Sequence, residues 1–241
     1  MKKRILAAAS LFHILTDAAA VIVPMIFPIL YNEKFLITRY SQIGLLSNIG
    51  LFTTLFIQFL VVRLSYRHEY RLMMLASGLG ICGAMALIPA SRTFGMLVLL
   101  FMGLRIFTSF YHPVVIAWVS KSRAGSGREL DDAMGIQSGS GNFGVVLGYL
   151  TVGYLAQARG WRFPLIVWAA AGLALVAAGI AILRGVSSRG EARPSLNAAS
   201  WLRSLVGIKR FIPGLIYGGA GWSVVIYYAP SLLNHRFEIL E

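Results

Sequence analysis

The amino-acid sequence predicts an all-α protein that crosses a membrane several times, and three observations support this. Of the 241 residues, 57% are hydrophobic and 13% are charged, whereas a soluble domain carries roughly 25% charged residues. The mean hydropathy is +0.72. Apolar segments long enough to cross a bilayer, about 20 residues each, recur along the chain. A chain of this composition cannot cover a water-facing surface, so we expect a lipid bilayer around it.

The apolar segments divide the chain into seven predicted spans. Each is expected to be a helix, because only a helix satisfies its own backbone hydrogen bonds in lipid. The first is expected to remain uncleaved, since His13 and Asp17 interrupt its apolar stretch and further spans follow. The predicted spans are 5–30, 42–62, 72–90, 94–119, 132–157, 163–183 and 211–232.

Basic residues between the spans predict the orientation of the chain. The formal net charge is +13, and the segments alternate in their Lys and Arg content. Of the 22 Lys and Arg residues, 15 fall on the side of the N-terminus, 6 fall on the other side and Arg105 lies within a span. This bias predicts a multi-pass protein of the inner membrane with a cytoplasmic N-terminus. No basic stripe with interleaved aromatic residues is present, so nucleic acid is not an expected partner.

The segment 184–210 is polar, rich in arginine and the longest connection between spans. We predict that residues 1–183 form a six-helix bundle, that 184–210 form a cytoplasmic linker, and that 211–241 begin a second bundle with its first helix. A bundle rarely ends on a single extra helix. We therefore expect the chain to be a fragment or a truncated protein whose C-terminal half is missing.

Four ionisable residues lie within the predicted spans, where charge is costly and usually functional. His13 and Asp17 share one face of the first span, and Arg105 and His112 share one face of the fourth. Estimated depths place Asp17 opposite Arg105 and His13 opposite His112, across a polar cavity. Asp17 or a histidine would then carry a coupling proton. The alternatives are a static Asp17–Arg105 ion pair, and a His112 that satisfies backbone groups freed by Pro113.

The fifth span is rich in glycine between residues 135 and 148. The segment contains G-x-G-x-x-G, but a dinucleotide site also needs a preceding strand and a later acidic residue, which are not predicted here. In a membrane, small residues let two helices approach closely. The predicted packing residues are Gly135, Gly139, Gly141, Gly144 and Gly148. Gln137 and Asn142 are expected either to line a substrate path or to bond a neighbouring helix.

The sequence shows no pattern that is typical of an enzyme. It lacks H-E-x-x-H, C-x-x-C and the phosphate-binding G-x-x-x-x-G-K-[ST]. The single cysteine, Cys82, can form neither an intramolecular disulfide nor a thiolate metal cluster. We predict no enzymatic activity, no cofactor and no metal site.

Several motifs together resemble the major facilitator superfamily, and within it the fosmidomycin-resistance-type drug efflux branch. They are His13-Ile-Leu-Thr-Asp17 followed by Pro24 and Pro28, then Gln58, Tyr111-His112-Pro113 and Gly139-Ser-Gly-Asn-Phe-Gly144. The resemblance covers about residues 10–150. The family's layout of a six-helix bundle, a linker and a further span is also similar.

The resemblance implies a twelve-helix fold of two six-helix halves that binds a small-molecule substrate between them near the midplane. It implies export coupled to inward proton movement, with His13, Asp17, His112 and Asn142 in the cavity. The chain departs from the family in two ways. Its loop 62–68 lacks the family's Asp, which puts the gating latch in doubt, and the second half is missing.

Three functions remain open from the sequence. The first is proton-coupled efflux of a small organic compound or drug, as in an antiporter of drug resistance. The second is import of a nutrient or metabolite on the same fold, since fold does not decide function. An unpaired Arg105 would favour an anionic substrate. The third is a truncated membrane protein that does not transport.

Overall fold

The computed structural model describes residues 2–64, 69–123, 127–186, 206–207 and 209–237, and these residues are helical apart from their short connections. The predicted all-α class is confirmed. The elements are α1 (Lys2–Asn32), α2 (Tyr40–Leu64), α3 (Tyr70–Leu87), the 3-10 turn η1 (Ile88–Ala90), α4 (Phe94–Ser122), α5 (Gly127–Arg159), α6 (Arg162–Ile182), α8 (Ile212–Tyr227) and α9 (Ala229–Phe237).

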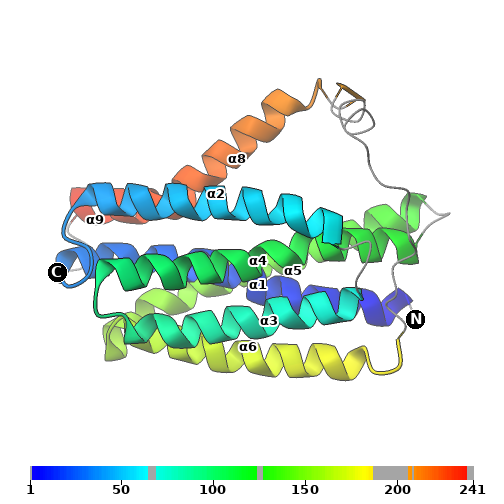
Figure 1. Cartoon of the computed structure of the whole chain (residues 1–241), viewed down its shortest axis with the longest axis horizontal. Coiled ribbons are helices and arrows are strands. Elements are labelled where there is room, and N and C mark those ends of the chain that lie inside the picture. The colour runs from blue at the N-terminus through cyan, green and yellow to red at the C-terminus, as the bar shows by residue number, and fades with distance from the viewer. Residues whose placement is uncertain (1, 65–68, 124–126, 187–205, 208, 238–241) are drawn as a thin grey trace.

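Helices α1 to α6 run side by side along the long axis of the molecule, and successive helices run in opposite directions (Figure 1). The connections after α1, α3 and α5 lie at one end, and the N-terminus lies at the other. This is the alternation that the charge pattern predicts. Most of the predicted linker, 187–205 and 208, falls outside the described residues, so the structure does not test the proposed boundaries at 184 and 210.

Helix α1 lies at the centre of the bundle. In its most apolar window 67% of the residues are buried, compared with 22% for α2. It packs against α3, α4, α5 and α6. Since α1 carries His13 and Asp17, the fold places these two polar residues inside the bundle, where α4 and α5 contact them.

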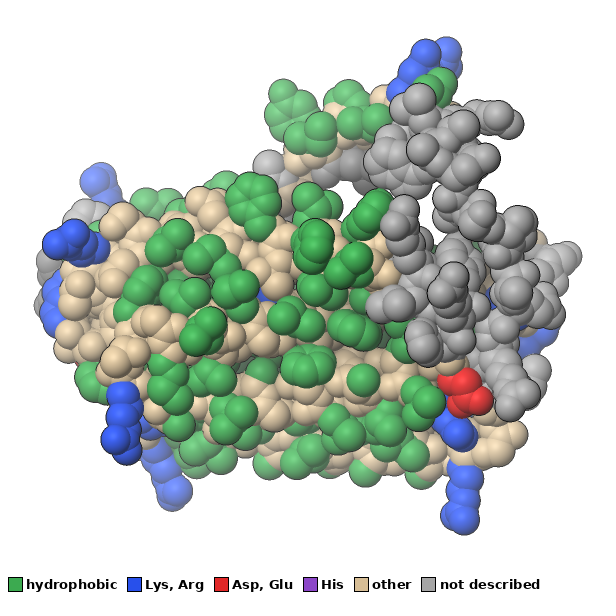
Figure 2. Space-filling model, viewed as in Figure 1, with side chains coloured by type: hydrophobic (Ala, Val, Ile, Leu, Met, Phe, Trp, Pro, Cys, Tyr) green, Lys and Arg blue, Asp and Glu red, His purple; other side chains and the backbone are tan. Residues whose placement is uncertain are grey.

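Among the described residues, five helices are long and apolar enough to cross a membrane: α1, the part of α2 from Tyr40 to Val61, α3 with η1, α4 and α6. Figure 2 shows hydrophobic side chains over the middle of the molecule, with Lys and Arg gathered towards its two ends. At 31 residues, α1 is about 46 Å long, more than the roughly 30 Å hydrocarbon core of a bilayer. Its ends therefore reach the polar headgroups.

The fifth and seventh predicted spans differ from these five. Helix α5 has 33 residues and runs the length of the bundle, but its glycines and polar residues keep it out of that apolar set. The prediction of one helix over 211–232 is wrong. Helix α8 ends at Tyr227, and α9 begins at Ala229 with Pro230 in its first turn. Proline disfavours helical backbone in the residue before it and has no N–H to continue a helix, so the sequence did carry a signal for this break.

Glycines end two helices of the bundle. Gly160, with φ of +78°, follows α5 and donates its N–H to the carbonyl of Ala156 at 2.7 Å. Gly185, with φ of +76°, follows α6. Left-handed backbone after a helix is readily adopted by glycine, which has no Cβ to clash with the carbonyl.

Close contact between α1 and α5 depends on three of the predicted packing glycines. A Cβ at Gly144 would meet the backbone of Ile14, a Cβ at Gly148 would lie 2.8 Å from a methyl group of Val21, and a Cβ at Gly141 would meet His13 and Asp17. Small residues at these positions let the two backbones approach each other.

Gly135 and Gly139 do not take part in this contact. Both are exposed, and a Cβ at either position would meet no heavy atom within 4 Å among the described residues. The α1 side of α5 carries Gly141, Gly144 and Gly148, and the exposed pair lies off that side. The prediction that Gly135 and Gly139 pack against another helix is therefore wrong for the described residues.

Replacing Gly144 with alanine is expected to destabilise the bundle. The new methyl group would press on the main chain of Ile14, which cannot rotate away, and overpacking of this kind costs about 1–3 kcal/mol. The melting temperature of the purified protein in detergent, followed by intrinsic fluorescence, should fall. Gly139→Ala makes the same change on the same helix in open space and should leave the melting temperature unchanged or raise it slightly. Equal melting temperatures for the two variants would contradict the close contact.

Candidate functional site

Asp17 joins two histidines near the middle of the bundle. Its Oδ2 lies 3.1 Å from Nε2 of His13, one helical turn earlier, and its Oδ1 lies 3.5 Å from Nε2 of His112 on α4. The rings of His13 and His112 meet edge to face, with centroids 5.2 Å apart. We refer to His13, Asp17 and His112 as the polar cluster. The expectation that the two histidines face each other is met.

The hydrogen bonds of His13 require a proton to be shared within the cluster. Nδ1 of His13 lies 2.7 Å from the backbone carbonyl oxygen of Gln137. A carbonyl only accepts, so Nδ1 carries a hydrogen and donates it. Nε2 then faces the carboxylate of Asp17, and a favourable contact at 3.1 Å needs a second hydrogen between them. The pair therefore holds one proton, as an imidazolium beside a carboxylate or as a neutral imidazole beside a carboxylic acid.

Asp17 and His112 of the cluster line a polar cavity of about 880 Å³, and His13 lies behind them. The side chain of His13 is 7% exposed, that of Asp17 21%, and that of His112 38%. Exposure thus increases from the inside of the bundle towards the cavity. The cavity is lined by α1, α2, α4 and α8, through Thr16, Asp17, Ala20, Leu51, Thr54, Gln58, Arg105, Thr108, His112, Ile216, Gly219, Ile226 and Tyr227.

Tyr111 and Gln137 support the cluster from behind. The hydroxyl of Tyr111 donates to the carbonyl of Ala9 at 2.6 Å and accepts from the amide nitrogen of Gln137 at 3.1 Å. Its ring lies 4.9 Å from the ring of His13, and both Tyr111 and Gln137 are buried. Of the two roles expected for Gln137, bonding a neighbouring helix is the one that this geometry shows.

Sequence reasoning missed Tyr111 as part of the site. Its position next to His112 was the available signal: neighbouring residues on a helix point about 100° apart. When His112 faces the cavity, Tyr111 must therefore face another helix, and the helix it faces is α1.

Arg105 does not pair with Asp17. Its Nε donates to Oγ1 of Thr54 at 3.0 Å, and lies 3.5 Å from the carbonyl oxygen of Gly50. Both partners are neutral groups of α2. The predicted Asp17–Arg105 pair is therefore wrong. Depth alone did not reveal that the side chain of Arg105 is directed at α2. His112, two turns further along α4, reaches Asp17 instead.

Asn142 is exposed on α5 and is absent from the residues that line the polar cavity. Gly141, one residue earlier, is buried against His13 and Asp17. The predicted stripe of Gln137, Gly141, Gly144 and Gly148 is the buried side of α5. Asn142 lies off this side, so the structure does not bring it together with the cluster.

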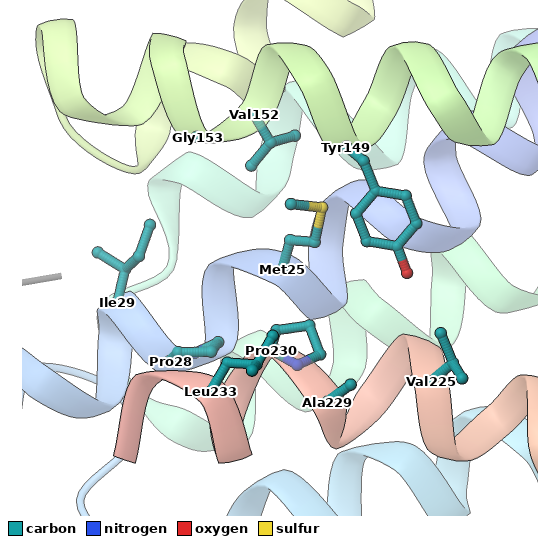
Figure 3. Close-up of a pocket in the computed structure, with 10 residues that line it drawn as sticks. All are labelled: Met25, Pro28, Ile29, Tyr149, Val152, Gly153, Val225, Ala229, Pro230 and Leu233. Atoms are coloured by element: carbon teal, nitrogen blue, oxygen red, sulfur yellow. The ribbon is translucent and has the colours of Figure 1, made fainter. Parts of the chain in front are cut away.

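A second cavity, of about 370 Å³, lies between α1, α5, α8 and α9 (Figure 3). Its walls are almost entirely apolar: Met25, Pro28, Ile29, Tyr149, Val152, Gly153, Val225, Ala229, Pro230 and Leu233. The hydroxyl of Tyr149 has no hydrogen-bond partner in the part of the chain that the structure describes. The tyrosine hydroxyl is the one polar side-chain group in this lining, so the second cavity has few groups that could bind a proton or a charged substrate. We therefore assign the functional site to the polar cavity.

Comparison with known proteins decides the family. The model of the Major Facilitator Superfamily matches residues 8–239. The chain belongs to the Major Facilitator Superfamily. Membership of this superfamily points to a transporter rather than an enzyme. No curated protein matches the sequence.

Solved structures of transporters share the superfamily fold. A bacterial homologue of the human lysosomal transporter Spinster, in an inward-facing and unoccupied conformation, aligns with a TM-score of 0.75 and 15% identity, over 97% of this chain and 55% of that one. A mutant of the peptide transporter POT in complex with sulfate aligns with a TM-score of 0.56 and 14% identity, over 98% of this chain and 46% of that one. The chain thus spans about half the length of these superfamily transporters.

Replacing Tyr111 with phenylalanine should loosen the support of the cluster. The change removes the acceptor of the Gln137 amide and a second donor to the carbonyl of Ala9, which keeps its bond within α1. A buried group left unpaired costs about 1–3 kcal/mol, so the melting temperature in detergent should fall. Tyr154→Phe on α5, where the residue is 74% exposed, is the matched control and should have no effect. A Tyr111→Phe protein as stable as the control would show that the hydroxyl bonds are unimportant.

Proposed function

We propose that this protein acts as a proton-coupled secondary transporter that exports a small organic compound by alternating access. The observation that carries the proposal is the contact of Asp17 with His13 and His112, since Asp17 and His112 line the polar cavity. A transporter coupled to protons needs a group inside the membrane that gains and loses a proton while it is in contact with the substrate cavity. A carboxyl group between two imidazoles at the cavity supports this role.

The arrangement of the cluster supports a path for the proton. His13 is buried and held by the backbone of α5, whereas His112 is partly open to the cavity. Asp17 touches both rings. A proton that enters from the cavity through His112 would reach the shared position in one further transfer. Departure of that proton changes the net charge of the cluster. It therefore changes the binding free energy of a charged substrate in the cavity.

Export is the direction we propose because the motifs resemble the fosmidomycin-resistance-type efflux branch. Tyr111-His112-Pro113 and the Gly-Asn-Phe-Gly segment carry the resemblance. We further propose location in the inner membrane with a cytoplasmic N-terminus, from the bias of basic residues. We also propose that residues 1–183 form one half of the transporter and that 211–241 begin the second. A non-transporting role is disfavoured by the cluster, since charged groups inside a membrane are costly to keep without a function.

Arg105 favours an anionic substrate. Its guanidinium lines the polar cavity, and the hydrogen bonds shown for it go to Thr54 and Gly50, which carry no charge. A substrate carboxylate or phosphonate would supply the missing opposite charge. The same observation favours a second candidate function, which is import of an anionic metabolite on the same fold. The direction of transport distinguishes the two.

Asp17→Asn should abolish coupling while the protein still inserts in the membrane. An amide cannot take up the shared proton, so proton release driven by substrate should be lost. Everted membrane vesicles, energised to an acidic interior and challenged with a panel of organic anions and neutral drugs, should show substrate-dependent loss of the pH gradient only with the native chain. Asp131→Asn, at an exposed acid on α5, is the control and should match the native chain. Full activity of Asp17→Asn would refute the coupling role, and uptake in the opposite direction would support the importer.

Arg105→Gln should raise the KM for an anionic substrate at least tenfold, since a charge-assisted hydrogen bond to a substrate is worth about 1.5–3 kcal/mol. Arg105→Lys keeps the charge but loses the paired N–H donors of the guanidinium, so its KM should lie between those of the native chain and Arg105→Gln. Transport of a neutral compound should change little in either variant. An unchanged KM for anions in Arg105→Gln would exclude the guanidinium as the anion-binding group.

A further inference from the structure

The polar cluster also has the composition of a metal site. It offers one ligand atom from each of His13, Asp17 and His112, and these three atoms lie within 4.8 Å of one another. Within the ranges that the structure describes, it is the one group of three or more His, Cys, Asp or Glu residues that is so arranged. Two imidazoles and a carboxylate are ligands that suit transition metals such as Zn²⁺, whereas Mg²⁺ and Ca²⁺ prefer oxygen ligands.

The distances in the cluster fit a tetrahedral ion. With bonds of about 2.0–2.1 Å, two ligands of a tetrahedral Zn²⁺ lie about 3.3 Å apart. Each carboxylate oxygen of Asp17 lies near this distance from one histidine: Oδ2 is 3.1 Å from Nε2 of His13, and Oδ1 is 3.5 Å from Nε2 of His112. One ligand atom from each residue lies within 4.8 Å of the others, so the cluster must tighten by up to about 1.5 Å to hold the ion. His112 can make this adjustment because its side chain is 38% exposed on the cavity.

The orientation of His13 is the second and independent observation. A histidine that binds a metal usually donates its other ring N–H to a carbonyl or carboxylate, which directs the free nitrogen at the ion. His13 does this through Nδ1, at 2.7 Å from the backbone carbonyl of Gln137. Gly141 leaves the space for the ring against α5. The fold itself therefore aims Nε2 of His13 at Asp17 and His112.

We propose that His13, Asp17 and His112 bind one divalent transition-metal ion, with Zn²⁺ the best fit. Three protein ligands leave the fourth position of the ion open to the polar cavity, where water or a coordinating group of a small molecule binds. The ion takes the position of the proton shared by His13 and Asp17, since histidine must lose that proton to become a ligand. The inference concerns metal binding alone and does not rest on the proposed transport.

Metal binding can be measured on the purified chain in detergent, carrying an affinity tag without histidine. Zn²⁺ should bind at one ion per chain by equilibrium dialysis with elemental analysis. Co²⁺ in its place should give the intense visible absorption of a tetrahedral site. His13→Ala and His112→Ala should each weaken Zn²⁺ binding at least tenfold. The double variant His68→Ala/His235→Ala removes the other two histidines of the sequence and should bind as the native chain does.

Each alternative result has a defined meaning. If the native chain shows no stoichiometric Zn²⁺ and no Co²⁺ absorption, the site does not exist. If the double variant loses the ion and His13→Ala keeps it, the ion binds elsewhere. The first of these results needs no cluster variant to fold. The outcomes are also separable from those for transport: bound Zn²⁺ with a fully active Asp17→Asn protein would refute proton coupling and leave the metal site standing. Loss of transport in Asp17→Asn, together with a native chain that binds no Zn²⁺, would support proton coupling and refute the metal site.

Discussion

The close contact of α1 with α5 is the constraint on which the rest of the site depends. His13 reaches the carbonyl of Gln137 only because the two helices meet at Gly141 and Gly144, where a side chain would strike α1. That bond fixes which nitrogen of His13 carries hydrogen, and so fixes what Nε2 can do. Asp17 and His112 complete the cluster, but their positions relative to α5 follow from the same contact. A packing feature of three glycines thus determines the chemistry of a carboxylate and two imidazoles.

Hydropathy and charge predicted most of the fold, because both follow directly from the bilayer. An apolar segment of about 20 residues has few alternatives to a spanning helix. The prediction of one continuous helix over 211–232 failed because hydropathy measures partition into lipid. Pro230 acts instead by restricting the backbone conformation before it. Helix α5 was predicted as one of the apolar segments, with five packing glycines. The structure limits the packing to Gly141, Gly144 and Gly148, since only residues on one side of a helix can meet the same neighbour.

The site was predictable in its residues but not in its pairings. His13, Asp17, Arg105 and His112 stand out because ionisable residues are rare in spans. Which of them meet depends on the direction of each side chain as well as on depth: Arg105 bonds α2, and His112, two turns further along α4, is the partner of Asp17. The spacing of residues in the sequence predicts neither the bond from His13 to a backbone carbonyl nor the role of Tyr111. Both depend on how separate helices pack against one another.

The polar stripe of α5 has a consequence for how the protein is made. A segment enters the bilayer from the translocation channel according to its own hydrophobicity, and α5 hides Gln137 and its glycines only when α1 lies beside it. Helix α1 is synthesised first and is strongly apolar, whereas α5 emerges after three further helices. Burial of Gln137 therefore depends on the docking of α5 against helices that precede it in the chain, and not on the hydrophobicity of α5 alone.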